Sequence, residues 1–213
     1  MLLLLASLGI SGLSAAQGIR PDQVPLADLI EILFLDRELL AIDAAGGGQR
    51  ALRLRLEEQL LWKGSQGKVG IAFTDQRILA VAVGSAAWAQ ENRQLHEVLP
   101  SSAWFGDRVI LALTSRRLIG FTQAGNLIDI SLGIREKVLA ASVGENVAAL
   151  VTDRRALGLS PTAGGFFTTP MHLEERLEAV ESGANVSTVT TNRRLLIFRA
   201  PTGSWEERRR KLR

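Results

Sequence analysis

Short arginine-containing segments recur along this sequence and carry most of its candidate binding chemistry. Four segments of the form Thr-X-X-Arg lie at residues 74–77, 114–117, 152–155 and 191–194, and successive copies begin 40, 38 and 39 residues apart. A degenerate copy, Leu-Asp-Arg-Glu, occupies residues 35–38. We call these five segments the quartets. They contain eight of the 21 arginines of the chain but only four acidic residues.

The quartets suggest an anion-binding surface, because a guanidinium binds a carboxylate, phosphate or sulfate through two parallel hydrogen bonds. The candidate ligand-binding residues are Arg77, Arg116, Arg117, Arg154, Arg155, Arg193 and Arg194. An alternative interpretation makes these arginines structural. Each would then pair with an acid of its own turn or of a neighbouring repeat and hold the repeats together.

Other reactive side chains are sparse. The chain has no cysteine, which excludes disulfides, cysteine-ligated zinc and a thiol nucleophile, and it has two histidines. His96 and His172 stand beside Glu97, Glu174 and Glu175, but they lie about two repeats apart, and we interpret them as surface residues. No nucleophile elbow or phosphate-binding glycine loop is present. The sequence does not support catalysis, and we predict no metal and no cofactor.

The tryptophans offer a second kind of binding surface, since indole rings stack on sugars. They are Trp62, Trp88, Trp104 and Trp205. Trp88 and Trp205 each stand 14 residues after the start of a quartet, where packing between repeats is the simpler interpretation. The basic run at residues 208–213 is interpreted as part of a solvated edge strand.

Each quartet separates two apolar runs rich in β-forming residues, as a hairpin turn does. Before the later quartets stand Gly67, Gly106, Gly144 and Gly183, and after all but the second stand Gly47, Gly125, Gly164 and Gly203. The second copy has Ser85 and Ala86 in place of the later glycine. These positions predict two further turns in each repeat. Three turns in about 39 residues define four short strands.

A four-stranded unit repeated about every 40 residues resembles the blade of a β-propeller. The resemblance covers residues 26–213 and rests on the period and the turns, because the Gly-His and Trp-Asp signatures of one large propeller family are absent. It implies an all-β fold: a five-bladed β-propeller of four-stranded antiparallel blades, in a single domain of residues 17–213. For the innermost strand of the first blade there is only a weak candidate, at residues 20–26. The Thr-Asn-Arg-Arg quartet alone also resembles a strand turn of bacterial pleckstrin-homology-like domains.

The N-terminal segment has the pattern of a secretory signal. Residues 1–16 are uncharged, begin with a leucine run and end with Ser14 and Ala16 at the −3 and −1 positions of a cleavage site. No Lys or Arg precedes the leucines, and the alternative is a buried apolar segment of a cytoplasmic protein. We expect cleavage after Ala16 and a periplasmic or secreted protein without a stable membrane anchor.

These patterns predict an exported, non-enzymatic propeller that binds an anionic protein segment or glycan through its arginine-bearing face. One alternative is a lectin-like module that holds saccharides in tryptophan-lined grooves between blades. The least favoured alternative is a hydrolase or lyase with a central site. We expect a monomer. We also expect no nucleic-acid partner, because a net charge of +3 that comes from an arginine-biased composition is weak evidence for one.

Overall fold

The computed structural model describes residues 28–98, 100 and 102–210, and these residues form an all-β fold. The proposed signal at residues 1–16 and the proposed strand at residues 20–26 lie outside the described residues. The described residues contain no helix long and apolar enough to cross a membrane.

Nineteen strands of the described residues form five antiparallel sheets that follow one another along the chain. Sheet 1 contains β1 (Ile30–Leu35), β2 (Glu38–Asp43) and β3 (Gln49–Arg53). Sheet 2 contains β4 (Leu60–Gln66), β5 (Val69–Thr74), β6 (Arg77–Ala82) and β7 (Ala89–Asn92). Sheet 3 contains β8 (Ser102–Phe105), β9 (Val109–Leu113), β10 (Arg117–Thr122) and β11 (Leu127–Ser131). Sheet 4 contains β12 (Val138–Val143), β13 (Ala148–Thr152), β14 (Arg155–Ser160) and β15 (Gly165–Pro170). Sheet 5 contains β16 (Leu177–Ser182), β17 (Val186–Thr191), β18 (Arg194–Arg199) and β19 (Ser204–Arg209).

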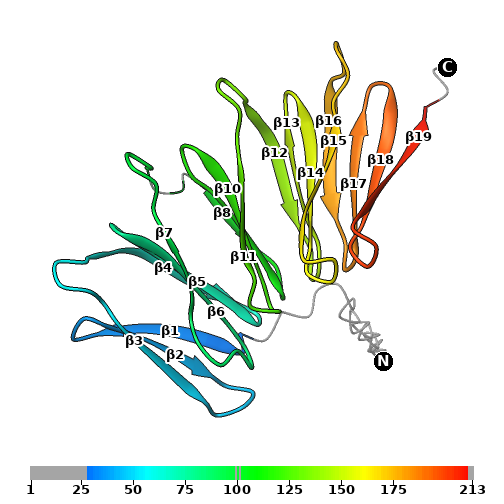
Figure 1. Cartoon of the computed structure of the whole chain (residues 1–213). Helices are drawn as coiled ribbons and strands as arrows, with labels where there is room; N and C mark the ends of the chain where they lie inside the picture. The colour runs from blue at the N-terminus through cyan, green and yellow to red at the C-terminus, as the bar shows by residue number, and fades with distance from the viewer. Residues whose placement is uncertain (1–27, 99, 101, 211–213) are drawn as a thin grey trace, which may run out of the picture.

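This succession confirms the prediction of five β-propeller blades joined by hairpins. Sheets 2 to 5 have the predicted four strands in simple meander order. Sheet 1 differs, since its described residues supply three strands, which correspond to the second, third and fourth strands of the other sheets. In Figure 1 the sheets stand side by side in an open arc, with sheet 1 at one end and sheet 5 at the other.

The predicted turns lie where the sequence placed them. The quartets join the second and third strands, and Gly67, Gly106, Gly144 and Gly183 join the first and second. Each quartet is a tighter turn than expected, because its outer residues lie in or beside the strands: Thr74 ends β5 and Arg77 begins β6. Gly125 shows why the third turn requires glycine, since its φ of 85° is a backbone conformation that other residues rarely adopt.

The two ends of each sheet differ in their turns: one end has the glycine turns, and the other has the quartet. The glycine turns lie at the inner ends, where the sheets converge in Figure 1. There the backbone links each sheet to the next through Leu29 N to Gly67 O, Lys68 N to Asp107 O, Arg108 N to Glu145 O and Asn146 N to Ala184 O. We call these ends the hub. The quartets lie at the opposite, diverging ends together with the connections between sheets, residues 54–59, 93–98, 132–137 and 171–176. We call these ends the outer rim.

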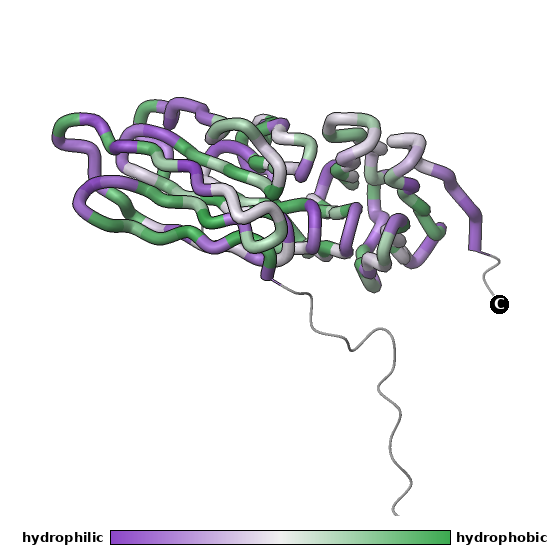
Figure 2. The backbone as a smooth tube through the Cα atoms, turned by 90° about the horizontal axis from the view of Figure 1, so that it is seen from below, coloured by the Kyte–Doolittle hydropathy of each residue, from purple (hydrophilic) through white to green (hydrophobic). Residues whose placement is uncertain are grey.

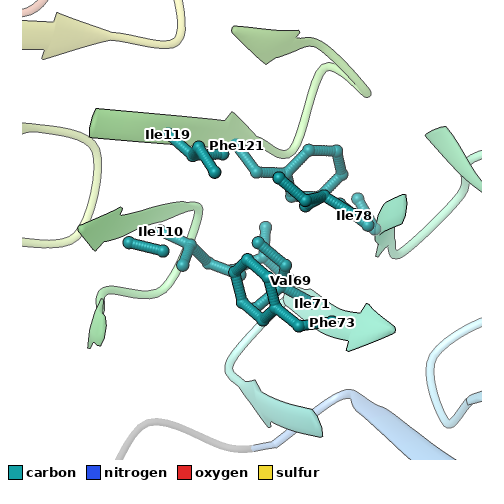
Figure 3. Packing of buried hydrophobic residues seen from close by; sticks show 10 residues of the cluster. Val69, Ile71, Phe73, Ile78, Ile110, Ile119 and Phe121 are labelled. Carbon is teal, nitrogen blue, oxygen red and sulfur yellow. The ribbon is translucent and has the colours of Figure 1, made fainter. Parts of the chain in front are cut away.

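The hydrophobic core consists of layers between neighbouring sheets. Between sheets 2 and 3, Ile71 and Phe73 pack with Ile110, Ile119 and Phe121 (Figure 3). Further clusters fill the spaces between the other pairs of neighbouring sheets. Strands such as β5, β6 and β10 are buried throughout because both faces of their sheets are covered. This explains why their sequences are continuously apolar and do not alternate.

Sheet 5 has one covered face and one open face. Its strands β17 and β18 alternate between buried and partly exposed residues. Thr188 and Thr190 occupy the open face at the repeat positions where sheet 2 has Ile71 and Phe73. In Figure 2 the segment that leads to the C-terminus is coloured as hydrophilic, in agreement with the composition of β19. A polar outer face is what keeps a terminal repeat soluble.

Candidate functional site on the outer rim

A buried cluster of threonine, glutamate and arginine recurs at the outer rim. In sheet 3, the Thr114 hydroxyl donates to Glu97 Oε1 at 2.7 Å and accepts from the backbone N–H of Arg117 at 3.1 Å. The Arg117 guanidinium binds the same carboxylate through Nε to Oε1 at 2.8 Å and Nη2 to Oε2 at 3.1 Å. The same contacts join Thr74, Glu58 and Arg77; Thr152, Glu136 and Arg155; and Thr191, Glu175 and Arg194.

Each glutamate reaches the quartet from the connection that precedes its own sheet. Residues 94–97 form a turn in which Glu97 N donates to Gln94 O at 3.0 Å, while Gln94 N donates to Glu97 Oε2 at 2.9 Å. His96 has a φ of 59°, as the third residue of a type II turn requires. The same turn, with the glutamate as its fourth residue, occurs at Glu58, Glu136 and Glu175. The turn thus holds its own glutamate in position for the quartet arginine.

The quartet arginines also join neighbouring sheets. Arg117 begins β10 in sheet 3, and its Nη2 donates to the carbonyl of Asn92 at the end of β7 in sheet 2, at 3.1 Å. Equivalent bonds run from Arg77 to Arg53 O, from Arg155 to Ser131 O and from Arg194 to Pro170 O. The last residue of each complete quartet therefore holds two blades together, as the structural interpretation of the arginines expects.

The hydrogen bonds of each cluster keep its glutamate ionised at neutral pH. Burial alone would raise the pKa of Glu175, but hydrogen bonds from Arg194, the His172 amide and Thr191 outweigh it and lower that pKa to about 2. The pKa values of Glu58, Glu97 and Glu136 are lowered for the same reasons. Burial would lower the pKa of Arg117, but its carboxylate partners raise it. At neutral pH these four glutamates are charged and fully used in binding the arginines.

The seven predicted site residues therefore divide into two groups. Arg77, Arg117 and Arg194 are buried, and the side chain of Arg155 is 26% exposed. The guanidiniums of these four residues are engaged inside the fold. Their neighbours Arg116, Arg154 and Arg193 are exposed on the outer rim. The anion-binding hypothesis is thus restricted to the third residue of the last three quartets.

The three exposed arginines differ in their surroundings. Arg193 binds Glu174 at 3.2 Å, and Arg154 donates to the Ile134 carbonyl at 2.9 Å. Arg116 makes no side-chain hydrogen bond or ion pair within the part of the chain that the structure describes. Of the three, Arg116 is therefore the residue best placed to bind a ligand.

Arg116 lines a hollow of about 440 Å³ at the rim between sheets 3 and 4. Arg135, from the connection to sheet 4, lines the same hollow and likewise has no acidic partner among the described residues. Gln94, Ser115 and Ile134 also line it, as does Glu136, whose carboxylate binds Arg155. The hollow therefore combines two cations that have no acidic partner in the described part of the chain with an amide, a hydroxyl and an aliphatic side chain.

The histidines and tryptophans do not line this hollow. His96 and His172 are exposed in different connections, and the described residues contain no cluster of three metal-binding side chains. Trp88 is buried between sheets 1 and 2, and its Nε1 donates to Arg50 O at 3.0 Å. Trp205 makes the equivalent bond to Phe167 O at 2.9 Å and packs on Phe198. Both indoles thus act in packing between blades.

A second, polar hollow of about 360 Å³ lies at the hub. Arg108, Gln123, Thr162, Asn146 and Asn185 contribute to its lining, and the Asn146 amide donates to Asn185 Oδ1 at 2.9 Å. The sequence interpretation did not include these residues. Their signal was available, because Lys68, Arg108, Asn146 and Asn185 occupy the same position in four successive repeats.

The glutamates of the rim clusters were also missed as a set. Glu58, Glu97, Glu136 and Glu175 recur at intervals of 39 residues, a more regular spacing than that of the quartets themselves. Searching for an acid with the same period as the arginines would have identified them.

Comparison with known proteins identifies no family for this chain. No family model and no curated protein matches the chain. Solved structures that are similar include yeast RCC1 (Prp20) bound to Kap60, with 9% identity, 81% of this chain and 54% of that chain covered, and a TM-score of 0.39. YCF48 bound to D1 peptide has 15% identity, coverage of 87% and 69%, and a TM-score of 0.33. The WD40 domain of SCAP from fission yeast has 12% identity, coverage of 88% and 57%, and a TM-score of 0.36.

These similarities concern the fold alone. The chain spans about half the length of the Prp20 chains that it matches. The assignment of β-propeller blades therefore rests on the five sheets of hairpin-linked strands themselves.

Proposed function

We propose that this chain is a non-enzymatic binding module whose outer rim holds a carboxylate-rich segment of a partner protein. The observation that carries this proposal is a pair of guanidiniums, Arg116 and Arg135, in the hollow between sheets 3 and 4, neither of which has an acidic partner among residues 28–98, 100 and 102–210. A guanidinium binds a carboxylate through two parallel hydrogen bonds, and two of them can hold neighbouring acidic side chains.

The state of the rim glutamates supports binding rather than catalysis. A general acid at neutral pH needs a raised pKa, whereas those of Glu58, Glu97, Glu136 and Glu175 are lowered. Each of these carboxylates already accepts hydrogen bonds from an arginine and a threonine.

An anionic glycan presents the same chemistry to the two arginines, through carboxylates or sulfates. The test therefore uses two probes: a fluorescein-labelled polyglutamate peptide and a sulfated oligosaccharide. We expect the peptide to bind more tightly, because the hollow also contains the aliphatic side chain of Ile134. Tighter binding of the oligosaccharide would assign the surface to glycans.

The decisive variant is Arg116→Gln combined with Arg135→Gln. We expect the Kd for the polyglutamate peptide to rise about tenfold, because two charge-assisted contacts are lost. The matched control is Arg108→Gln with Arg199→Gln, which removes two charges at side chains about half exposed and outside the rim. Equal weakening in the two double variants would show that only net charge matters and would overturn the site.

A further inference from the structure

Each connection between sheets presents one aliphatic side chain to water. Leu56, Leu95, Ile134 and Leu173 recur at intervals of 39 residues, and they are 84%, 79%, 88% and 89% exposed. We call these four residues the aliphatic ladder. Single exposed leucines are normal on protein surfaces. Recurrence of an exposed aliphatic residue at one position in four repeats needs a separate explanation.

The fold holds the ladder residues outward without using them in packing. Each is the second residue of a four-residue turn, and the fourth residue is the glutamate of the buried cluster. In the turn at residues 94–97, the Glu97 side chain binds Thr114, Arg117 and the Gln94 amide. Leu95 is therefore fixed on a rigid support while its own side chain remains in water. A rigid apolar anchor loses little conformational entropy when it binds a partner.

Hollows lie beside the ladder residues. The 440 Å³ hollow between sheets 3 and 4 includes Ile134, Arg116 and Arg135. Another hollow at the rim, of about 530 Å³, includes Leu61 and Val98, which are 43% and 65% exposed. The rim thus offers protruding aliphatic side chains together with recesses that can receive side chains of a partner.

The charge of the rim changes along the arc. Around sheets 1 and 2, the quartets and connections expose four carboxylates, those of Asp36, Glu38, Glu57 and Asp75, against two exposed cations, Arg37 and Arg55. Around sheets 3 and 4 they expose Arg116, Arg135, Lys137 and Arg154, with Asp153 as an exposed acid among them. An anionic membrane would be attracted by one part of this rim and repelled by the other. A protein segment with its own charge pattern can match both parts.

We propose that the aliphatic ladder is a docking line for an extended protein segment that carries apolar residues at the spacing of the ladder and acidic residues opposite Arg116 and Arg135. The proposal rests on the proposed function, because it describes the partner of the same rim. Packed sheets lie about 10 Å apart, and these sheets diverge toward the rim in Figure 1. An extended chain advances about 3.3 Å per residue, so at least about three residues separate successive apolar positions of the partner.

The test uses synthetic peptides of glutamate and serine that carry leucine at every third, fourth or fifth position. Their counterparts carry glutamine in place of leucine. We expect one leucine spacing to bind the wild-type protein about tenfold more tightly than its glutamine counterpart, as measured by fluorescence anisotropy. Leu95→Ser with Ile134→Ser removes this difference. Leu35→Ser is the control, because Leu35 is 59% exposed at the rim but belongs to a quartet and not to the ladder.

Several results would overturn the proposal that the aliphatic ladder binds a protein segment. One is an equal affinity of leucine and glutamine peptides at every spacing, and another is an unchanged difference in the double serine variant. A third is loss of binding to phosphatidylglycerol vesicles in that variant while peptide binding stays unchanged, which would assign the ladder to a membrane. Failure of the proposed function is distinguishable, because in that case the glutamine peptides, which carry only the acids, do not bind the wild-type protein.

Discussion

Arg117 Nε lies 2.8 Å from Glu97 Oε1, and the two side chains are 2% and 1% exposed. The adjacent Arg116 is exposed at the rim. Two consecutive arginines of one hairpin turn thus have opposite roles, one in holding blades together and one at the surface. This difference can be measured by changing each arginine in the same way.

We expect Arg117→Gln to lower the free energy of unfolding by about 3 kcal/mol, because it leaves Glu97 charged and buried without its cation. Arg116→Gln should change it by less than about 0.5 kcal/mol, as exposed substitutions usually do. Urea unfolding followed by tryptophan fluorescence measures both. Similar stabilities of the two variants would contradict the structural role of Arg117.

The same clusters make stability depend on pH at the acidic end. Burial would raise the pKa of Glu175, but its hydrogen bonds lower it from 4.5 to about 2. Between these values the unfolded chain binds more protons than the folded chain. The contribution of Glu175 is therefore complete above about pH 4.5 and is lost as the pH falls toward 2.

The measurement is the free energy of unfolding at several values between pH 6 and pH 2.5. We expect a steady decrease in the wild-type protein and a shallower decrease in Glu175→Gln, because this variant has no carboxylate to protonate at that position. Glu174→Gln is the control, since Glu174 is exposed and next in sequence. Identical slopes in Glu175→Gln and the wild-type protein would contradict this assignment.

The sequence was a good guide to local features of the fold. Hairpin turns depend on nearby residues, so Gly144 and Gly183, and quartets such as residues 152–155, could be placed without knowledge of the rest of the chain. The strands that open at Val69, Val109 and Val186 begin where the repeat predicted. The five-fold repetition then determined the number of sheets.

The sequence did not show which arginine of a quartet is buried. This depends on the register of the hairpin and on a glutamate about 20 residues earlier, as Arg117 and Glu97 illustrate. The relative placement of the sheets is equally non-local. Phe198 of sheet 5, for example, packs where a Cβ on Gly158 of sheet 4 would stand. Such size matching between sheets leaves no periodic signal in either strand.

Export is a prediction that concerns the residues before Asp28. We expect the full chain, when expressed in a Gram-negative bacterium, to yield a periplasmic protein whose N-terminus is Gln17, as intact mass spectrometry would measure. Ala16→Asp should block cleavage, because the −1 position requires a small residue. An uncleaved wild-type chain in the cytoplasm would refute the signal and leave the fold of residues 28–210 unaffected.

The hub offers a last test, because Gly144 there lies directly against the next sheet. A Cβ on Gly144 would collide with the carbonyl oxygen of Gly183 in sheet 5, and a backbone atom cannot turn aside as a side chain can. Gly144→Ala must therefore push sheets 4 and 5 apart, and we expect it to lower the free energy of unfolding by about 3 kcal/mol. Gly165→Ala is the matched control, since a Cβ there meets nothing within 4 Å. Urea unfolding should show the control within about 1 kcal/mol of the wild-type protein. A Gly144→Ala protein as stable as this control would mean that the sheets do not meet at the hub as described.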